Sequence, residues 1–296
     1  MTDPLRIDAV LEDATRRLEA VSDSARLDAE LLLARAIDMP RSYLFAHPED
    51  TLDELAAERF ETALARRADG ESLAYITGVR EFWSLELMVT PATLVPRPET
   101  EILVDLALRE IPRDAEWKIL DLGTGSGAIA LAIAKERPLC SVTATDVSAD
   151  ALAVAAQNAR QLDIPDIDFI VGDWTEPVAD RTFNVILSNP PYVCAGDAAL
   201  DALRHEPQLA LVAGNDGLDA IRTIARDCVA LLESNGMLLV EHGATQQDAV
   251  EELIASYGWE DIACHNDYAG LPRVTAARHS QAMQQRRNCV TKRRTF

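Results

Sequence analysis

The sequence has few cysteines, and none of them lies in a pattern typical of a metal site or a disulfide framework. The chain has 296 residues and 5 cysteines, which are Cys140, Cys194, Cys228, Cys264 and Cys289. No two of them form a C-x-x-C pair, and the 5 histidines form no H-E-x-x-H group. We therefore expect reduced structural thiols and no bound metal ion.

Long apolar runs are missing as well. No apolar stretch in the chain approaches the roughly 20 residues that a membrane-spanning helix needs. The first residues, from Met1 to Arg6, lack the basic start and the apolar stretch of a secretory signal. These absences favour a cytoplasmic protein with no membrane partner. The 48 % of apolar residues is typical of a globular protein.

Basic residues are scarce relative to acidic ones. The chain has 28 Lys and Arg against 49 Asp and Glu, which gives a formal net charge of −21. A protein that binds DNA or RNA needs a positive field that releases counterions from phosphates, so direct nucleic-acid binding is not expected. The one basic segment is the tail over 279–296, which we expect to be disordered. Its basic residues from 286 onward are Arg286, Arg287, Lys292, Arg293 and Arg294.

The first quarter of the chain has helical periodicity. Apolar residues recur at helical intervals from Leu5 to Val21 and from Leu27 to Ile37, and a third helix is expected from Leu52 to Arg67. These segments predict a small helical bundle over 1–72. The stretch from Phe82 to Val89 is strand-like and is ended by Pro91, which predicts a hairpin linker over 73–96.

The rest of the chain alternates between strands and helices. After a helix over 99–110, strands are expected at 117–122, 141–146, 167–171, 183–188, 236–241, 259–264 and 272–277. Helices are expected near 127–136, 149–161, 216–234 and 245–257. This alternation predicts an α/β domain over 97–278, with a mostly parallel sheet of seven strands covered on both faces.

A glycine-rich turn joins the first of these strands to its helix. Asp121-Leu122 ends the strand, the helix begins at Ala128, and the turn between them is Gly123-Thr124-Gly125-Ser126-Gly127. Glycines in such a turn let the backbone approach a ligand closely. Asp146 ends the next strand, about 20 residues further on, where a carboxylate can accept hydrogen bonds from ribose hydroxyls. The glycine-rich turn and Asp146 together predict a site that binds a nucleoside.

Two nucleoside cofactors are compatible with the loop alone. Gly123, Gly125 and Ala128 also satisfy the G-x-G-x-x-A fingerprint of dinucleotide-binding proteins. Asp121 favours S-adenosylmethionine, because its carboxylate suits the ammonium of a methionine moiety and is unfavourable beside a pyrophosphate. After the third strand, Asp173 can accept from the adenine amino group and Trp174 can cover the ring.

The most specific motif is Asn189-Pro190-Pro191-Tyr192, directly after the strand over 183–188. The prolines end the strand and fix the turn, and an Asn at a strand's carboxyl end in such a sheet points into the ligand crevice. A side-chain amide or an exocyclic amine is a poor nucleophile, because its lone pair is delocalised. The Asn189 oxygen and the Pro190 carbonyl can accept from its two N–H bonds and turn the lone pair toward a methyl group. Tyr192 is expected to wall the pocket.

Together these motifs resemble the HemK/PrmC family, the peptide chain release factor N5-glutamine methyltransferases. The resemblance covers nearly the whole chain, to about Arg278. It is carried by Asp121-Leu-Gly-Thr-Gly-Ser-Gly-Ala, Asp146 and Asn189-Pro-Pro-Tyr, with support from Asp28-Ala-Glu-Leu-Leu-Leu, Leu94-Val-Pro-Arg-Pro-Glu-Thr-Glu, Gly172-Asp-Trp, Glu206-Pro and Glu241-His-Gly. The basic tail falls outside the family's pattern.

The resemblance implies a class I, Rossmann-like methyltransferase sheet with a helical N-terminal domain that helps to dock the substrate. It implies S-adenosylmethionine as cofactor, S-adenosylhomocysteine as product, and the glutamine of the Gly-Gly-Gln loop of class I release factors as substrate. By resemblance, the loop from Gly123 to Gly127, Asp146, Trp174 and Asn189 contact the cofactor, and the turn from Asn189 to Tyr192 holds the glutamine. Nothing in the sequence points to an obligate oligomer, so a monomer is expected.

Other functions stay open at this stage. Adenine-N6 DNA and RNA methyltransferases share the Asn-Pro-Pro-Tyr signature, and so does a sister family that methylates a glutamine of a ribosomal protein. The net charge disfavours the first, and Arg97-Pro-Glu-Thr-Glu favours the release-factor enzymes over the second. A NAD-dependent dehydrogenase and a non-catalytic protein with a nucleoside site are the alternatives from other classes.

Overall fold

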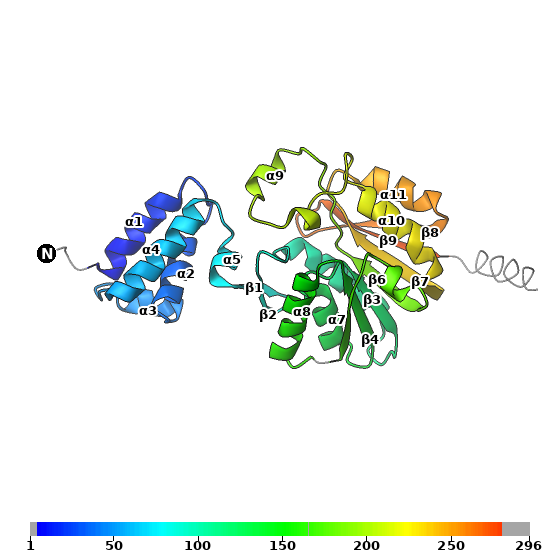
Figure 1. Ribbon diagram of the computed structural model, residues 1–296, viewed down its shortest axis with the longest axis horizontal. Coiled ribbons are helices and arrows are strands. Elements are labelled where there is room, and N and C mark those ends of the chain that lie inside the picture. Colours follow the sequence, from blue (N-terminus) through cyan, green and yellow to red (C-terminus); the bar gives the residue numbers. More distant parts are fainter. Residues whose placement is uncertain (1–4, 165, 280–296) are drawn as a thin grey trace, which may run out of the picture. The chain divides into compact units, whose positions relative to one another are not determined.

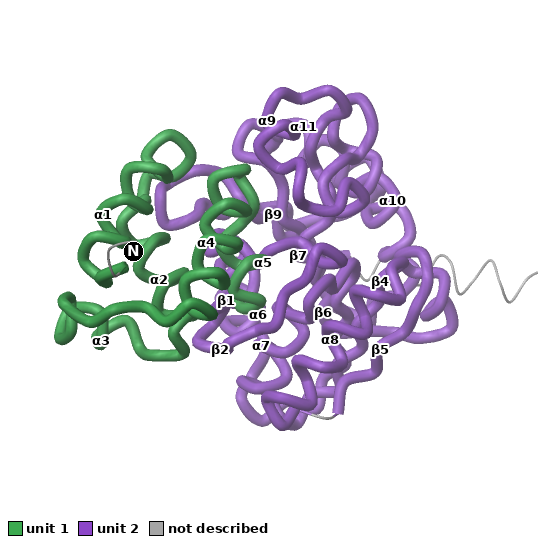
Figure 2. Tube along the Cα trace, turned by 60° about the vertical axis from the view of Figure 1, so that its left-hand side comes forward, with its two compact units in different colours: residues 1–79 green, residues 80–296 purple. Residues whose placement is uncertain are grey.

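The computed structural model of the chain describes residues 5–164 and 166–279 (Figure 1). The chain divides into two compact units, residues 1–79 and residues 80–296 (Figure 2). The basic tail from 286 onward lies outside the described residues. The finer division at 72, 96 and 278 stays a prediction. No helix in the described ranges is long and apolar enough to cross a membrane.

The first unit is helical. Its helices are α1 (Ile7–Leu18), α2 (Ala25–Ala36), α3 (Arg41–Ala46), α4 (Glu54–Ala68) and α5 (Leu73–Thr77). The sequence predicted the three longer ones, and it missed α3 and α5 because helices of one or two turns are too short to show a period. The α5 helix has a local signal nonetheless, since the Ser72 hydroxyl accepts from the Ala74 N–H and Gly78 ends the helix at φ 80°.

A buried ion pair ties two helices of this unit together. Asp28 of α2 accepts from the Arg67 guanidinium of α4 at 2.8 Å, and both side chains are largely buried. The Ser22 and Ser24 hydroxyls donate to the same carboxylate at 2.8 and 3.0 Å. Because these donors satisfy the carboxylate, it stabilises the packing of α2 on α4 without an uncompensated buried charge.

A two-stranded hairpin follows the helices. Its strands are β1 (Val79–Phe82) and β2 (Leu85–Met88), and the turn is made by Trp83 and Ser84 at φ 52° and 54°. The hairpin was expected, but the strand-like stretch assigned to 82–89 is wrong, because the turn lies inside it. Left-handed turns of this kind favour Asn and Gly, so Trp-Ser gave no turn signal.

The second unit is built on one seven-stranded sheet. Its strands are β3 (Lys118–Leu122), β4 (Ser141–Asp146), β5 (Ile167–Val171), β6 (Phe183–Ser188), β7 (Leu232–Glu241), β8 (Trp259–Asn266) and β9 (Pro272–His279). Their order is β5-β4-β3-β6-β7-β9-β8, and all neighbours are parallel except β9, which is antiparallel to both β7 and β8. The predicted fold class and all seven strands are confirmed.

Helices cover both faces of this sheet (Figure 1). They are α6 (Glu101–Glu110), α7 (Ala128–Glu136), α8 (Ala149–Gln161), α10 (Asp219–Asp227) and α11 (Gln247–Ser256), with the short helices η1 (Pro98–Thr100), η2 (Glu176–Val178), α9 (Ala199–Ala202), η3 (Gln208–Ala210) and η4 (Cys228–Ala230). Side chains of β3 alternate between the two apolar cores, since Ile119 packs with α6 and α7 while Leu120 packs with α10 and α11.

One predicted helix is too long. The helix expected over 216–234 ends at Asp227, and β7 already begins at Leu232, four residues before its predicted start. The residues at 228–232 are all apolar, which is compatible with a buried helix and with a buried strand. Periodicity therefore could not place the end of the helix or the start of the strand.

The strand order reverses at β3, and the candidate site lies there. Strands β4 and β6 flank β3 on either side, and Leu122 at the end of β3 is level with Ser188 at the end of β6. In open α/β sheets the ligand crevice forms at the carboxyl ends of such neighbouring strands. The glycine loop after β3 and the turn after β6 therefore leave the sheet side by side.

Candidate active site

The glycine loop is a left-handed turn held by a carboxylate. Gly123, Gly125 and Gly127 have φ 71°, 56° and 84°, a region that residues with a Cβ avoid. At Gly127 a Cβ would also lie 3.1 Å from Ala155 and from Leu131. A side chain here would press on Leu131 of α7 and on Ala155 of α8.

Asp146 connects this loop to the end of β4. Its Oδ2 accepts from the Gly125 N–H at 2.9 Å and its Oδ1 accepts from the Ser148 N–H at 2.9 Å. Burial raises the pKa of the carboxyl above its usual value, although both backbone donors lower it. Each carboxylate oxygen has a second lone pair, so Asp146 can accept further hydrogen bonds from a ligand in the cavity that it lines.

Asp121 lies behind the loop rather than on its surface. It is fully buried, and its Oδ2 accepts from the Thr124 hydroxyl at 2.6 Å and from the Ala130 N–H at 3.2 Å. Within the described ranges its Oδ1 has no hydrogen-bond partner, and burial raises the pKa of the carboxyl to about 7. A buried oxygen without a donor is costly, so this atom suits a ligand that brings a cationic N–H group.

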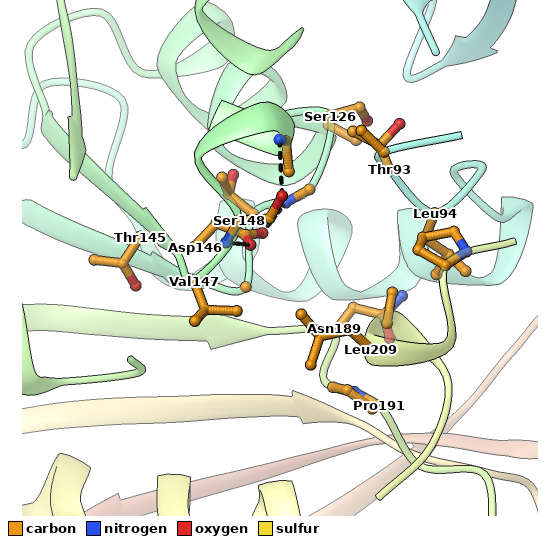
Figure 3. A pocket seen from close by; sticks show the side chains of 18 of the residues that line it. Thr93, Leu94, Ser126, Thr145, Asp146, Val147, Ser148, Asn189, Pro191 and Leu209 are labelled. Carbon is orange, nitrogen blue, oxygen red and sulfur yellow. Dashed lines mark hydrogen bonds between the residues drawn. The ribbon is translucent and has the colours of Figure 1, made fainter. Parts of the chain in front are cut away.

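A cavity of about 380 Å³ opens between the loop and the turn after β6 (Figure 3). Nine of the predicted site residues line it, and they are Gly123, Thr124, Gly125, Ser126, Asp146, Asp173, Trp174, Asn189 and Pro191. The other four do not line it, and they are Asp121, Gly127, Pro190 and Tyr192. The motifs read from the sequence therefore meet at one cavity, although their individual roles stay predictions.

Several lining residues were missed in the sequence. They are Ala92, Thr93, Leu94, Pro96, Thr100, Ala128, Ile129, Thr145, Val147, Ser148, Ala151, Gly172, Pro207, Leu209 and Ala210. The segment before η1 was read only as part of a linker or as a helix entry, and the segment around η3 was assigned no role. A signal was present, because Leu94-Val-Pro-Arg-Pro-Glu-Thr-Glu and Glu206-Pro are among the stretches that carry the family resemblance.

An ion pair joins those two missed segments. Arg97 pairs with Glu206, which is buried, and the second Glu206 oxygen accepts from the Val95 N–H at 3.3 Å. Leu209, three residues further on, is 65 % exposed and reaches the cavity wall. The ion pair thus fixes the segment that carries Leu209 against the strand-to-helix connection that carries Leu94.

The Asn-Pro-Pro-Tyr turn is held from several sides. The Asn189 Nδ2 donates to the Thr100 Oγ1 at 3.0 Å, and Ser188 before it donates to the Leu122 carbonyl at 2.8 Å. The Gln246 Nε2 donates to the Tyr192 carbonyl at 3.1 Å. The turn is therefore anchored to β3, to η1 and to the start of α11, so its atoms are preorganised for contact with a ligand.

Glu241 lies behind this turn, at the end of β7. It is fully buried, and its Oε1 accepts from the Tyr192 hydroxyl at 3.2 Å. Its Oε2 has no hydrogen-bond partner among the described residues. Burial raises the pKa of Glu241 to about 7, and burial together with the nearby Glu241 charge raises the pKa of Tyr192 well above its usual value.

The cavity fits a nucleoside with an amino-acid tail. Among its described lining residues none is Lys, Arg or His, and the charged ones are Asp146 and Asp173. Such a wall disfavours a pyrophosphate and therefore a dinucleotide. Apolar Val147 and Leu209 together with Trp174 offer surfaces for a base, and Asp121, hydrogen-bonded to Thr124 of the cavity wall, is buried directly behind it.

Comparisons with known proteins agree with this reading. Residues 9–78 match the family model of the PrmC N-terminal domain, and residues 99–242 match that of the methyltransferase small domain. Among solved structures, a methyltransferase from Pyrococcus furiosus superposes with a TM-score of 0.53 at 18 % identity over 74 % of this chain and 99 % of its own. At that identity the likeness shows the fold alone.

Curated relatives are far more similar in sequence. The release factor glutamine methyltransferase of Coxiella burnetii is 44 % identical over 93 % of this chain and 99 % of its own length. The one of Escherichia coli is 43 % identical over 92 % of this chain and 98 % of its own length. The alignments with these relatives include both the helical unit and the sheet unit of the chain. The chain therefore belongs to the release factor glutamine methyltransferase family.

Proposed function

We propose that this protein transfers a methyl group from S-adenosylmethionine to the side-chain amide nitrogen, N5, of the glutamine in the Gly-Gly-Gln loop of peptide chain release factors. The name of the relatives and their coverage of the whole chain support the substrate. The observation that carries the reaction is the Asn189 side chain, which lines the same cavity as the glycine loop and Asp146. A substrate that acts in translation termination makes the cytoplasm the place of the proposed reaction.

Different residues of the site are proposed to contact different parts of the cofactor. Asp146 is proposed to accept from the ribose hydroxyls, Asp173 and Trp174 to contact the adenine, and the Asp121 oxygen to face the ammonium. When bound, S-adenosylmethionine supplies a methyl group already activated by its sulfonium. The Trp174 ring is packed against the glycine loop, since a Cβ at Gly123 would lie 3.5 Å from it. Contact between the adenine and Trp174 would therefore also affect the conformation of the loop.

The chain's own part of the chemistry is orientation. The Asn189 Oδ1 and the Pro190 carbonyl accept from the two N5 hydrogens of the glutamine, which holds the lone pair in line with the methyl group. N5 forms one bond to the methyl carbon as the bond between that carbon and the sulfonium sulfur breaks, S-adenosylhomocysteine leaves as a neutral thioether, and N5 releases one proton to solvent. The enzyme needs no nucleophile or strong base of its own, because the sulfur that leaves is already cationic. Preorganisation of the turn reduces the cost of ordering the substrate amide.

Methyl transfer from labelled S-adenosylmethionine to a purified release factor tests the proposal. Two forms of the factor are compared, one with the Gly-Gly-Gln glutamine intact and one with that glutamine changed to Ala, and an Asn189→Ala enzyme runs beside the wild type. We expect label only on the intact factor, and a loss of about a hundredfold with Asn189→Ala, which is the usual scale for one orienting group. Equal label on both forms would place the methyl group elsewhere and refute the substrate atom.

A further inference from the structure

Tyr192, which ends the Asn-Pro-Pro-Tyr turn, is held at two points by the end of β7 and the connection that follows it. Its hydroxyl donates to the Glu241 Oε1 at 3.2 Å, and its carbonyl accepts from the Gln246 Nε2 at 3.1 Å. Gln246 directly precedes α11. It is not among the described residues that line the cavity, so it can affect the site only through the turn.

The Gln246 amide bridges two main-chain groups that fix its orientation. Its Oε1 accepts from the Gly243 N–H at 2.8 Å, while its Nε2 donates to the Tyr192 carbonyl. A main-chain N–H can only donate and a main-chain carbonyl can only accept, so the amide fits one way round. An ionised Glu has nearly the same shape but only acceptors, and it would face the Tyr192 carbonyl oxygen with a negative charge. This bridge therefore needs Gln.

Two glycines leave the space that the bridge occupies. A Cβ at Gly217 would lie 2.3 Å from the Tyr192 carbonyl oxygen and 2.8 Å from the Gln246 Nε2. A Cβ at Gly243 would lie 2.9 Å from the Gln246 Oε1. The main chain thus approaches the bridge closely on both sides, and the Tyr192 carbonyl has little room to move while Gln246 is in place.

The connection that carries Gln246 is itself tied to the sheet. His242 is buried, its N–H donates to the Arg273 carbonyl of β9 at 2.9 Å, and its Nε2 is hydrogen-bonded to the Thr275 Oγ1 at 2.9 Å. The Gln246 N–H donates to the Gly243 carbonyl at 2.9 Å, which closes a turn ahead of α11. Gln246 therefore holds the turn after β6 from a fixed point.

We propose that Gln246 is a positioning residue for methyl transfer, because its amide holds the Tyr192 carbonyl and thereby the turn that presents Asn189 to the substrate. The inference rests on the proposed function, which assigns acceptors of this turn to the substrate amide. The two prolines between Asn189 and Tyr192 are stiff in φ, so a shift of the Tyr192 carbonyl is transmitted along the turn. A misplacement of about 1 Å can cost about a hundredfold in rate.

Steady-state kinetics with a release factor compare the wild type with Gln246→Glu and Gln246→Met. The first keeps the acceptor for Gly243 and lacks the donor, and the second has neither. We expect kcat to fall at least about tenfold in both, because the reacting groups lose their alignment. S-adenosylhomocysteine affinity, measured by calorimetry, should stay within about threefold of wild type, since Gln246 does not touch the cavity.

The matched control is Gln247→Glu, which makes the same change of charge one residue further on. The Gln247 side chain donates to Glu251 at 3.1 Å, one turn along α11, and makes no printed contact with the turn after β6. This variant should keep kcat within about twofold of wild type. Wild-type kcat in Gln246→Met, or a loss of S-adenosylhomocysteine affinity as large as the loss of kcat, would overturn the inference.

A second readout needs no turnover. The Asn189 side-chain amide donates to the Thr100 Oγ1 at 3.0 Å, and its NMR signal is assigned by its absence in Asn189→Asp. The signal should shift in Gln246→Glu and Gln246→Met and stay in place in Gln247→Glu. If the wild type fails to methylate a release factor, the proposed function falls and this spectrum alone decides the positioning role. An unshifted signal in both Gln246 variants of an active enzyme refutes that role and leaves the proposed function standing.

Discussion

Asp121 is a buried carboxylate that the free protein does not satisfy. Its Oδ1 has no donor among the described residues, and burial raises the pKa of the carboxyl from its ordinary value of 3.8 to about 7. The folded state therefore holds the proton more tightly than the unfolded state does. The stability gained from this protonation is fully present below about pH 4 and is lost as pH rises through about 7. Above pH 7 the protein carries the whole cost of the buried charge.

Asp121→Asn should therefore stabilise the ligand-free protein above about pH 7. The amide keeps an acceptor for Thr124 and Ala130 and introduces no charge. Each pKa unit corresponds to about 1.4 kcal/mol, so a rise of at least about 2 °C in the unfolding temperature is expected, measured by calorimetry. An unfolding temperature that falls at every pH would contradict this view of Asp121.

The same residue predicts how cofactor binding depends on pH. A cationic ligand group beside Asp121 favours the ionised carboxylate, so S-adenosylhomocysteine should bind more tightly as pH rises from about 6 to about 7.5 and release protons to the buffer. Titration calorimetry in buffers of different ionisation enthalpy measures both effects. Asp121→Asn should bind more weakly and should lose the proton release. The same pH slope in wild type and Asp121→Asn would exclude Asp121 as the responsible group.

A helix residue, Asn158, also supports the glycine loop. Asn158 of α8 is fully buried, accepts from the Met88 N–H at 2.7 Å, and donates to the Met88 and Ser126 carbonyls at 3.0 and 2.9 Å. One side chain thus joins the hairpin strand β2 to the loop that contains Ser126. This connection between α8, β2 and the glycine loop was not visible in the sequence, because a buried Asn in a helix has no local sequence signature.

Asn158→Ala should destabilise the protein by about 2–4 kcal/mol, because it leaves one N–H and two carbonyls buried without partners. Urea unfolding measures that loss. S-adenosylhomocysteine affinity should fall as well, since the loop loses its contact at Ser126. Asn158→Asp is the matched variant, which retains the acceptor for Met88 and lacks the donors. Full stability of Asn158→Ala would mean that water or another group replaces all three bonds.

The elements that sequence periodicity resolves are the long ones with a repeated burial pattern. All seven strands of the sheet and its major helices were predicted, since each alternates or repeats over several residues. The turn at Trp83-Ser84 and the start of β7 at Leu232 were not, because the first has unusual turn residues and the second lies in an evenly apolar run. Local pattern fails where the tertiary environment decides the conformation.

At the scale of the molecule, the fold brings together residues that lie far apart in the sequence. Thr100 and Glu241 both lie in stretches that supported the family resemblance, yet they are 141 positions apart in the sequence. Only the placement of η1 and β7 beside the turn after β6 brings Thr100 to Asn189 and Glu241 to Tyr192. The sequence could therefore predict that the glycine loop and the turn after β6 face one cavity, and it could not predict the side chains that hold that turn.

The net charge of −21 makes a separate prediction for the whole molecule. We expect no methyl transfer to adenine-containing DNA or RNA, even at low salt, where electrostatic attraction to phosphates is strongest. Filter binding with labelled S-adenosylmethionine checks this, with a release factor as positive control. Label on an oligonucleotide at the rate seen for the release factor would reopen the adenine-N6 alternative.

Mass spectrometry of a release factor tests most directly whether this protein methylates one glutamine nitrogen of that factor. A release factor from cells lacking such an enzyme is incubated with this protein and S-adenosylmethionine, and the peptide with the Gly-Gly-Gln loop is fragmented. The predicted result is one added methyl group on the glutamine side chain, absent without enzyme. A methyl group on any other residue, or an unchanged peptide after complete incubation, would contradict the account.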